Sequence, residues 1–337
     1  MANFKQPHVK IKKKGSKLDS FEVLECQLSN STASINVLSF GCTLQQFKIS
    51  VPKYLQRDVV LGYSSWKDYK EVFDRQHSVF FGAIVGPIAG RISNARIPWK
   101  NETFEFEANE AEHLLHGGKR NFSNANWQLI YFESLPFPRV IFGINSKKSN
   151  IHLPGELYCE VTYTLLEKSL IINIESTALE DTLCNPTQHS YFNPGGHATS
   201  ILEAHSSVYA SGVLDLNTDK TPTGSIKKIS SAPFKLNSHY TNLDQAFVLS
   251  TDRQQASLVA QDGFQLRFST NQPTLQVYVG GKNPKVGKEN VVYNEFSGIC
   301  LEQQAEPDAP NHDNFSDIYL QKGQKKTNVF IIDFEQT

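Results

Sequence analysis

The chain has 337 residues, of which 39% are hydrophobic and 20% charged, so it can bury a substantial core beneath an ordinary polar surface. Lys and Arg together number 33, against 34 for Asp and Glu. This balance provides no net field that would attract nucleic acid or an anionic membrane, and it is more compatible with a neutral small-molecule ligand.

The five cysteines give no sign of a disulfide framework or of a zinc site. They are Cys26, Cys42, Cys159, Cys184 and Cys300. Their number is odd, their spacing is wide and no two form a CxxC pair. No apolar segment follows the lysines of residues 1–17, and no run of 18 apolar residues occurs, so we expect a cytoplasmic protein without a membrane span.

In chain order, the first element with a clear pattern is a short amphipathic helix over residues 65–76. Four large apolar side chains there have helical spacing. The next is a strand over residues 103–107, where Thr, Phe, Glu, Phe and Glu alternate with the period of two of a half-buried strand. The rest of the chain offers strands rather than helices.

A β-hairpin is predicted in the middle of the chain. Residues 160–164 and 170–174 are rich in β-branched and aromatic side chains, and the polar residues 167–169 between them suit a turn. Further alternating strands are expected at residues 265–268 and, near the end, at residues 328–334.

These many short strands predict an all-β fold, a large antiparallel β-sandwich with helices only as accessories. No linker rich in Gly, Ser or Pro divides the chain, and no internal repeat is present. We therefore expect one domain over residues 1–337, with a ligand site among side chains on a concave sheet face.

Five clusters combine glycine turns with groups that can form hydrogen bonds or transfer protons. They are residues 90–91, 116–118, 189–193, 275–278 and 301–304. The two strongest candidates for proton transfer are His189 and Glu302. A histidine is the usual acid or base near neutral pH, because its ordinary pKa is about 6.5.

Each of these residues also has a structural interpretation. His189 lies in a mixed polar and aromatic segment and could be a structural histidine. Glu302 lies between three apolar residues and two glutamines, so it is either buried in its strand or, by alternation, exposed. His116 before two glycines indicates a tight turn with a close backbone approach, and Asp244 alone reads as an ordinary loop carboxylate.

The glycine-rich segment 82–90 before Arg91 invites comparison with phosphate-binding loops. Its pattern fits neither G-x-G-x-x-G nor the P-loop, so a nucleotide site is rejected.

Taken in order, the motifs resemble the aldose 1-epimerase (galactose mutarotase) family from about residue 20 to the C-terminus. They are Val-Leu-Gly-Tyr at 60–63, the glycine-rich segment 82–92, Leu-His-Gly-Gly at 115–118, Thr-Gln-His-Ser-Tyr-Phe-Asn at 187–193, Pro-Thr-Gly at 222–224, Asp-x-x-Phe at 244–247, Pro-Thr-Leu-Gln-Val-Tyr at 273–278, Gly-Ile-Cys-Leu-Glu-Gln-Gln at 298–304 and Pro-Asp-Ala-Pro-Asn at 307–311. Agreement at so many ordered points is specific.

The resemblance implies the galactose mutarotase-like supersandwich and an isomerase that interconverts the anomers of a free hexose, galactose or glucose, without metal or other cofactor. It implies Glu302 as general base and His189 as general acid. The sugar-binding groups that it implies are Arg91, His116, Asp244 and Gln276. A monomer and a homodimer are both compatible with the sequence.

Four positions depart from the family pattern and put the sugar specificity in question. Gly90 replaces a usual Asn, Pro87 stands where Arg is common, His113 occupies a usual Asn position, and Gln188 replaces Asn.

Three other functions are weighed against this one. A glycosidase would pair two carboxylates such as Glu302 and Asp244 across a glycosidic bond, but it would leave His189 without a role. A mutarotase for hexose 6-phosphates would need an additional arginine cluster, which the sequence lacks. A non-catalytic sugar-binding or sensing protein would have no need of both Glu302 and His189.

Overall fold

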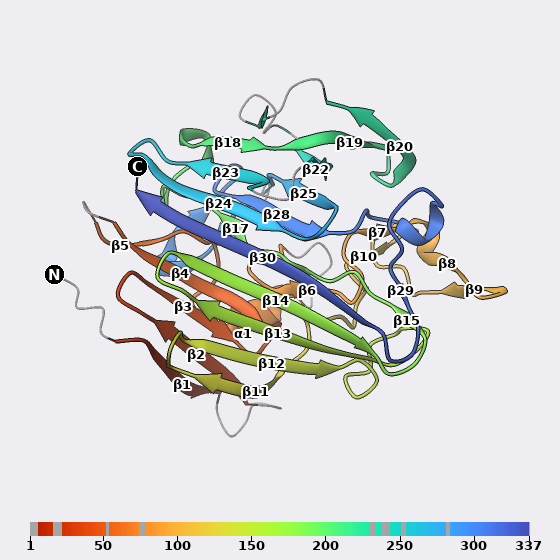
Figure 1. Ribbon diagram of the computed structural model, residues 1–337, viewed down its shortest axis with the longest axis horizontal. Helices are drawn as coiled ribbons and strands as arrows, with labels where there is room; N and C mark the ends of the chain where they lie inside the picture. Colours follow the sequence, from red (N-terminus) through yellow and green to blue (C-terminus); the bar gives the residue numbers. More distant parts are fainter. Residues whose placement is uncertain are drawn as a thin grey trace.

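Antiparallel strands dominate the computed structural model, which confirms the predicted all-β class (Figure 1). The structure describes residues 6–15, 22–51, 54–73, 79–229, 233–236, 241, 243–250, 254–280 and 284–336. Within these ranges, no helix has the length and apolarity needed to cross a lipid bilayer.

The largest sheet has nine strands that run across the view of Figure 1. In spatial order they are β11 (Gln128–Glu133), β12 (Arg139–Asn145), β13 (Leu157–Leu165), β14 (Ser169–Ala178), β30 (Lys325–Gln336), β24 (Phe264–Thr270), β23 (Ala256–Val259), β18 (His205–Val208) and β21 (Phe234–Lys235). The predicted hairpin is confirmed as β13 and β14, which pair antiparallel with Leu165 opposite Leu170. The strands expected at 265–268 and 328–334 are β24 and β30.

Two further sheets form the rest of the framework. A five-stranded sheet has the order β1 (His8–Lys14), β2 (Val23–Ser29), β3 (Ala33–Leu38), β4 (Thr43–Val51) and β5 (Tyr54–Asp58). A six-stranded sheet has the order β17 (Tyr191–Phe192), β28 (Ile299–Gln304), β25 (Thr274–Tyr278), β22 (Asp244–Leu249), β19 (Ala210–Leu216) and β20 (Pro222–Lys228).

Short strand pairs and single helical turns connect these sheets. The pairs are β6 (Ile84–Val85) with β16 (Thr187–Gln188), β7 (Arg91–Ile92) with β10 (Leu114–Leu115), β8 (Arg96–Trp99) with β9 (Glu102–Glu105), β15 (Thr182–Leu183) with β29 (Tyr319–Leu320), and β26 (Lys285–Val286) with β27 (Val292–Tyr293). The 3-10 turns are η1 (Ser93–Ala95), η2 (Ile201–Glu203), η4 (Lys288–Asn290) and η5 (Ala309–Asn311). Strand β9 ends before the predicted residue 107, because the backbone N–H of Phe106 bonds to the carbonyl of Ala95 instead.

The α-helix α1 (Trp66–Phe73) lies within the predicted segment 65–76, of which residues 74–76 fall outside the described part of the chain. Ser65 precedes the helix, and its hydroxyl accepts a hydrogen bond from the N–H of Lys67, an N-cap contact. Trp66, Tyr69 and Phe73 are buried, as the helical spacing predicted.

One apolar cluster joins the nine-stranded sheet to the other two. It includes Phe142 and Phe330 from the large sheet, Phe47 from the five-stranded sheet, and Leu275 and Leu301 from the six-stranded sheet. Side chains of the alternating strands point into this layer, as in β13, where buried and partly buried residues alternate along all nine positions. The assignment of the whole chain to one domain stays a prediction, which this shared core favours.

A buried ion pair links the five-stranded sheet to the turn η4. The Nζ atom of Lys288 lies 2.7 Å from Oδ2 of Asp58, and the two side chains are 2% and 5% exposed. The same ammonium donates to the backbone carbonyls of Gln45 and Val60, so all three of its protons have acceptors. Full pairing of this kind offsets the cost of removing both charges from water.

We expect Lys288→Met to lower the free energy of unfolding by about 3–5 kcal/mol, because it leaves Asp58 buried without its partner. Urea denaturation measures the change. The control is Lys325→Met, which removes an exposed pair with Glu175 and should cost about 1 kcal/mol at most. Equal costs for the two variants would show that the buried pair is not a structural requirement.

Candidate active site

All six residues that the sequence singled out line one cavity of about 580 Å³. Arg91 lies in β7, Asp244 in β22, Gln276 in β25 and Glu302 in β28. His116 follows β10, and His189 lies between β16 and β17. The structure therefore brings together six side chains that are spread over more than 200 positions of the sequence.

Strand pairing fixes the spacing of the acidic and amide groups. Gln276 of β25 lies directly opposite Glu302 of β28, and Asp244 of β22 lies opposite Tyr278, two residues beyond Gln276. Because side chains two positions apart share a face of a strand, Asp244, Gln276 and Glu302 project from the same face of the six-stranded sheet.

His189 lies between two short strands, β16 and β17, that pair with different partner strands. Strand β16 pairs with β6, whereas β17 pairs with β28. The backbone of His189 is held on both sides, because its N–H donates to the carbonyl of Ala83 and its carbonyl accepts from the N–H of Gly82. The imidazole is thus carried by a backbone that is fixed at both polar groups.

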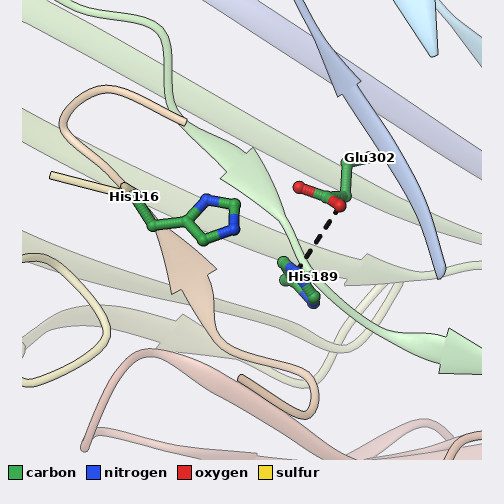
Figure 2. Close-up of side chains that lie close together, drawn as sticks. All are labelled: His116, His189 and Glu302. Atoms are coloured by element: carbon green, nitrogen blue, oxygen red, sulfur yellow. Dashed lines mark ion pairs between the residues drawn. The ribbon is translucent and has the colours of Figure 1, made fainter. Parts of the chain in front are cut away.

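The side chains of His189 and Glu302 face each other in the cavity (Figure 2). Nε2 of His189 lies 3.5 Å from Oε1 of Glu302, and the two side chains are 5% and 3% exposed. Nδ1 of His189 lies 3.3 Å from Sγ of Cys300. The other carboxylate oxygen of Glu302, Oε2, has no hydrogen-bond partner among the described residues.

The choice that the sequence left open for Glu302 is now decided: its side chain is buried. All six residues of β28 are buried, so both faces of this strand are covered and alternation carries no information about exposure. Cys300 is a contact that the sequence analysis did not anticipate; it lies two residues before Glu302 and shares its strand face.

Burial shifts the pKa values of Glu302 and His189 in opposite directions. Loss of solvation, with a contribution from the nearby charge of Asp244, raises the pKa of Glu302 to about 8. Loss of solvation lowers the pKa of His189 to about 4, since the charged imidazolium is disfavoured away from water. These shifts favour a proton on Glu302 and a neutral imidazole on His189 near neutral pH.

His116 occupies the tight turn predicted from its two glycines. Its φ is 52°, and Gly117 follows with φ of 80°. A Cβ atom at Gly117 would lie 2.6 Å from the carbonyl oxygen of Gly86, so the close approach requires glycine. The N–H of Gly90 donates to Nδ1 of His116 at 3.2 Å, which leaves the proton of the neutral ring on Nε2.

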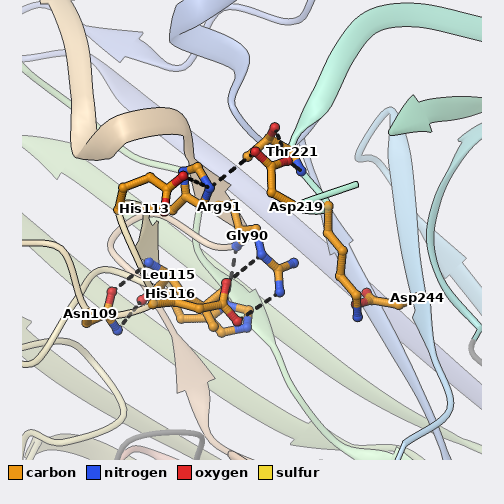
Figure 3. A network of polar contacts seen from close by, with 12 residues as sticks. Gly90, Arg91, Asn109, His113, Leu115, His116, Asp219, Thr221 and Asp244 are labelled. Carbon is orange, nitrogen blue, oxygen red and sulfur yellow. Dashed lines mark hydrogen bonds and ion pairs between the residues drawn. The ribbon is translucent and has the colours of Figure 1, made fainter. Parts of the chain in front are cut away.

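Arg91 is held by a carboxylate that the sequence analysis missed. Its Nε donates to Oε2 of Glu110 at 2.6 Å, and its Nη2 donates to Oε1 at 3.0 Å (Figure 3). This two-point geometry fixes the guanidinium plane beside the cavity. Glu110 lies in a loop without any periodic pattern, so no signal in the sequence pointed to it.

Asp244 has a protein partner on each oxygen. Nε2 of Gln276 donates to Oδ1 at 2.7 Å, and Nζ of Lys220 donates to Oδ2 at 2.7 Å. Lys220, which also lines the cavity, is a second residue that the sequence analysis missed. Asp244 therefore lines the cavity from the start of strand β22 and is not an ordinary loop carboxylate; its role in sugar binding stays a prediction.

Two groups of described side chains have the composition of a cation site. One is His116, His189 and Glu302, and the other is Glu112, His113 and Asp219. In each group one imidazole accepts a backbone N–H at Nδ1, from Gly90 in His116 and from Asn94 in His113. The remaining nitrogen, Nε2, then carries the proton and is a donor, which does not suit metal coordination.

The four departures from the family pattern have different surroundings. Gly90 lines the cavity, and a Cβ atom there would lie 2.9 Å from Cβ of Pro307. Gln188 is buried and bonds to the carbonyl of Gly82, so it supports the backbone beside His189. His113 reaches the rim loop at Asp219, whereas Pro87 does not line the cavity.

Comparison with known proteins shows the family of this chain. The family described as aldose 1-epimerase matches residues 25–333. The chain belongs to the aldose 1-epimerase family. The resemblance inferred from the ordered motifs is thereby confirmed, over nearly the whole span expected for it.

Curated members of the aldose 1-epimerase family match most of the chain. Galactose mutarotase of Sus scrofa is 30% identical over 318 residues, covering 89% of this chain and 90% of the relative. Aldose 1-epimerase of Escherichia coli strain K12 is 26% identical over 328 residues, covering 89% and 92%.

Solved structures share the fold. The galactose 1-epimerase from Lactobacillus acidophilus superposes with a TM-score of 0.84 at 23% identity, covering 98% of this chain and 99% of the other. The aldose epimerase homologue from C. elegans has a TM-score of 0.83 at 22% identity, with coverage of 91% and 96%. The predicted supersandwich is confirmed.

The raised pKa of Glu302 is directly measurable. We expect infrared difference spectra to show a protonated carboxylic acid at pH 7 that loses its proton as the pH rises through about 8. The band should be absent in Glu302→Gln. A wild-type carboxyl that is already ionised at pH 6 would contradict the argument from desolvation.

Proposed function

We propose that this protein is an aldose 1-epimerase that interconverts the α and β anomers of a free hexose by opening and reclosing the ring. The observation that carries the proposal is the facing pair His189 and Glu302, 3.5 Å apart in the lining of the cavity. The names of its relatives, galactose mutarotase and aldose 1-epimerase, support the same activity.

Ring opening needs one base and one acid on the same sugar. Glu302 removes the proton of the C1 hydroxyl while His189 delivers a proton to the ring oxygen, so the C1–ring oxygen bond breaks and the aldehyde forms. After rotation about the C1–C2 bond, His189 takes the proton back and Glu302 returns one to the carbonyl oxygen. The opposite anomer results, with no net change in the protein.

The roles of general base and general acid require an ionised Glu302 and a protonated His189 at the start of ring opening. Burial favours the reverse, with the proton on Glu302 and a neutral His189. Both arrangements contain one proton, so ring opening starts from the less populated form, in which the proton has moved from Glu302 to His189 across their 3.5 Å contact, and it ends in the favoured form. The desolvated site thus stabilises the open-chain stage relative to the same groups in water.

The other side chains would hold the sugar hydroxyls. His116 presents its Nε2–H as a donor, because Nδ1 is occupied by the N–H of Gly90. Arg91, Asp244 and Gln276 add a cation, an acceptor and an amide around the same cavity. Positioning of this kind supplements the factor of about 10² to 10⁴ that proton transfer typically contributes.

The charges around the cavity favour an uncharged sugar. Its lining includes three cationic side chains and three carboxylates, together with the protonated carboxyl of Glu302. The cations are Arg91, Lys220 and Lys285, and the carboxylates belong to Glu110, Asp244 and Glu295. Ion pairs join Arg91 to Glu110 and Lys220 to Asp244. A hexose phosphate would bring a dianion into a lining with no excess of positive charge.

The glycosidase alternative is disfavoured by the contacts of Asp244. Both of its oxygens accept hydrogen bonds from Gln276 and Lys220, which suits a binding group better than a second proton-transfer group. Absence of sugar release from aryl glycosides would remove that alternative.

We expect catalytic amounts of the protein to accelerate the relaxation of freshly dissolved α-D-galactose or α-D-glucose in a polarimeter. Glu302→Gln and His189→Asn should each lower kcat by about 10² to 10⁴, because each removes one proton-transfer group. Thermal unfolding of the variants controls for folding. Full activity in either variant would remove that residue from its role, and sugar binding without acceleration by the wild type would favour the binding-protein alternative.

The pH dependence follows from the need for one proton on the His189 and Glu302 pair. Loss of that proton as the pH rises through about 8 removes the acid, and gain of a second as the pH falls through about 4 removes the base. We expect kcat/KM to be highest between these limits and to fall on both sides. A rate that keeps rising well above pH 8 would contradict the assignment.

A further inference from the structure

Lys220 is a rim residue whose side chain turns inward. Its Nζ lies 2.7 Å from Oδ2 of Asp244. The residue lines the cavity, although its side chain is 51% exposed. An exposed lysine gains little from an ion pair and loses rotamer freedom on being held. Stability of the fold is therefore a poor explanation for this contact.

The loop that carries Lys220 is built around an unfavourable backbone conformation. Lys220 has φ of 68°, a left-handed conformation that costs a residue with a side chain more than it costs glycine. The turn is closed by two backbone bonds, from the N–H of Asn217 to the carbonyl of Thr221 and from the N–H of Lys220 to the carbonyl of Asn217. Oδ1 of Asp219 accepts both the N–H and the hydroxyl of Thr221.

A second anchor ties this loop to another part of the rim. Oδ2 of Asp219 lies 3.4 Å from Nε2 of His113, whose side chain is 5% exposed. Because Nδ1 of His113 accepts the N–H of Asn94, the proton of the neutral ring lies on Nε2, which is close to Asp219 but forms no hydrogen bond with it. Figure 3 shows His113, Asp219 and Thr221 close together on one side of Arg91 and Asp244.

Lys220 and Asp244, which both line the cavity, have hydrogen-bonding capacity that their mutual contact does not use. Among the described residues, the Lys220 ammonium donates to one acceptor, Asp244, although it has three protons. A carboxylate has about four lone-pair positions, and Asp244 uses two of them for Lys220 and Gln276. A sugar hydroxyl could donate to Asp244 and accept from Lys220 at the same time.

We propose that Lys220 is a sugar-binding residue of this site, whose ammonium holds Asp244 in place and donates to the same sugar hydroxyl that Asp244 accepts. The inference rests on the proposed function, since it takes an aldose as the ligand. It adds a specificity-determining contact to the cavity, a charged pair that reads one hydroxyl as both donor and acceptor.

The test compares Lys220→Met with wild type by polarimetry, using the better of galactose and glucose. A lost hydrogen bond to a charged donor corresponds to a factor of about ten or more, so we expect KM to rise about tenfold or more while kcat changes much less. Lys220→Arg should restore most of the loss. The control is Lys227→Met, which removes an ion pair with Asp215 outside the cavity and should leave KM unchanged.

A deoxy-sugar series identifies a direct contact. One monodeoxy hexose should bind wild type more weakly than the parent sugar, and for this sugar Lys220→Met should cost little more. An unchanged KM in Lys220→Met would overturn the proposal. So would a Lys220→Met substitution that weakens the binding of every deoxy sugar by the same factor as that of the parent sugar. If wild type fails to accelerate anomer exchange, the proposed function fails, and calorimetric titration with the same hexose decides the role of Lys220 separately: weaker binding by Lys220→Met supports it, and equal binding overturns it.

Discussion

Desolvation of Glu302 is the constraint on which the chemistry of this protein depends. A carboxyl on a strand that is covered on both faces cannot keep its ordinary pKa, and the same burial prevents the facing imidazole of His189 from holding a charge. The two groups consequently share one proton without forming a stable ion pair. A surface pair of the same residues would settle as carboxylate and imidazolium and would have little tendency to exchange the proton.

The charged side chains at the cavity rim, in contrast, are paired with opposite charges. Arg91 pairs with Glu110, and Asp244 pairs with Lys220, so the charges of these four residues compensate one another. Compensated charges can still form hydrogen bonds with hydroxyls, but they do not attract ions strongly. The cavity thus combines a buried pair, His189 and Glu302, with charged residues that are paired with one another, Arg91 with Glu110 and Lys220 with Asp244.

Much of the fold could be predicted from local pattern. The β13 and β14 hairpin followed from alternating β-branched residues and a polar turn, and helix α1 followed from the spacing of its buried aromatic residues. The burial of Glu302 could not be predicted, because alternation distinguishes faces only when one of them is exposed. The six candidate residues were found through the order of family motifs, whereas Glu110 and Lys220 lie in loops whose roles depend on tertiary pairing. No local rule indicates which distant charge such a loop will meet.

The position of His189 between two strand pairings has a consequence for how this protein can vary. Its backbone is tied to Gly82 and Ala83 beside β6, whereas Glu302 belongs to β28 of the six-stranded sheet. The distance between His189 and Glu302 therefore depends on how the β6 and β16 pair packs beside the six-stranded sheet. Substitutions in the apolar core behind β6 do not touch the cavity. They can nevertheless change the distance between His189 and Glu302 by tenths of an ångström, and so lower activity, while every cavity side chain is kept. Variation in activity among relatives would then be encoded in packing as much as in the cavity lining.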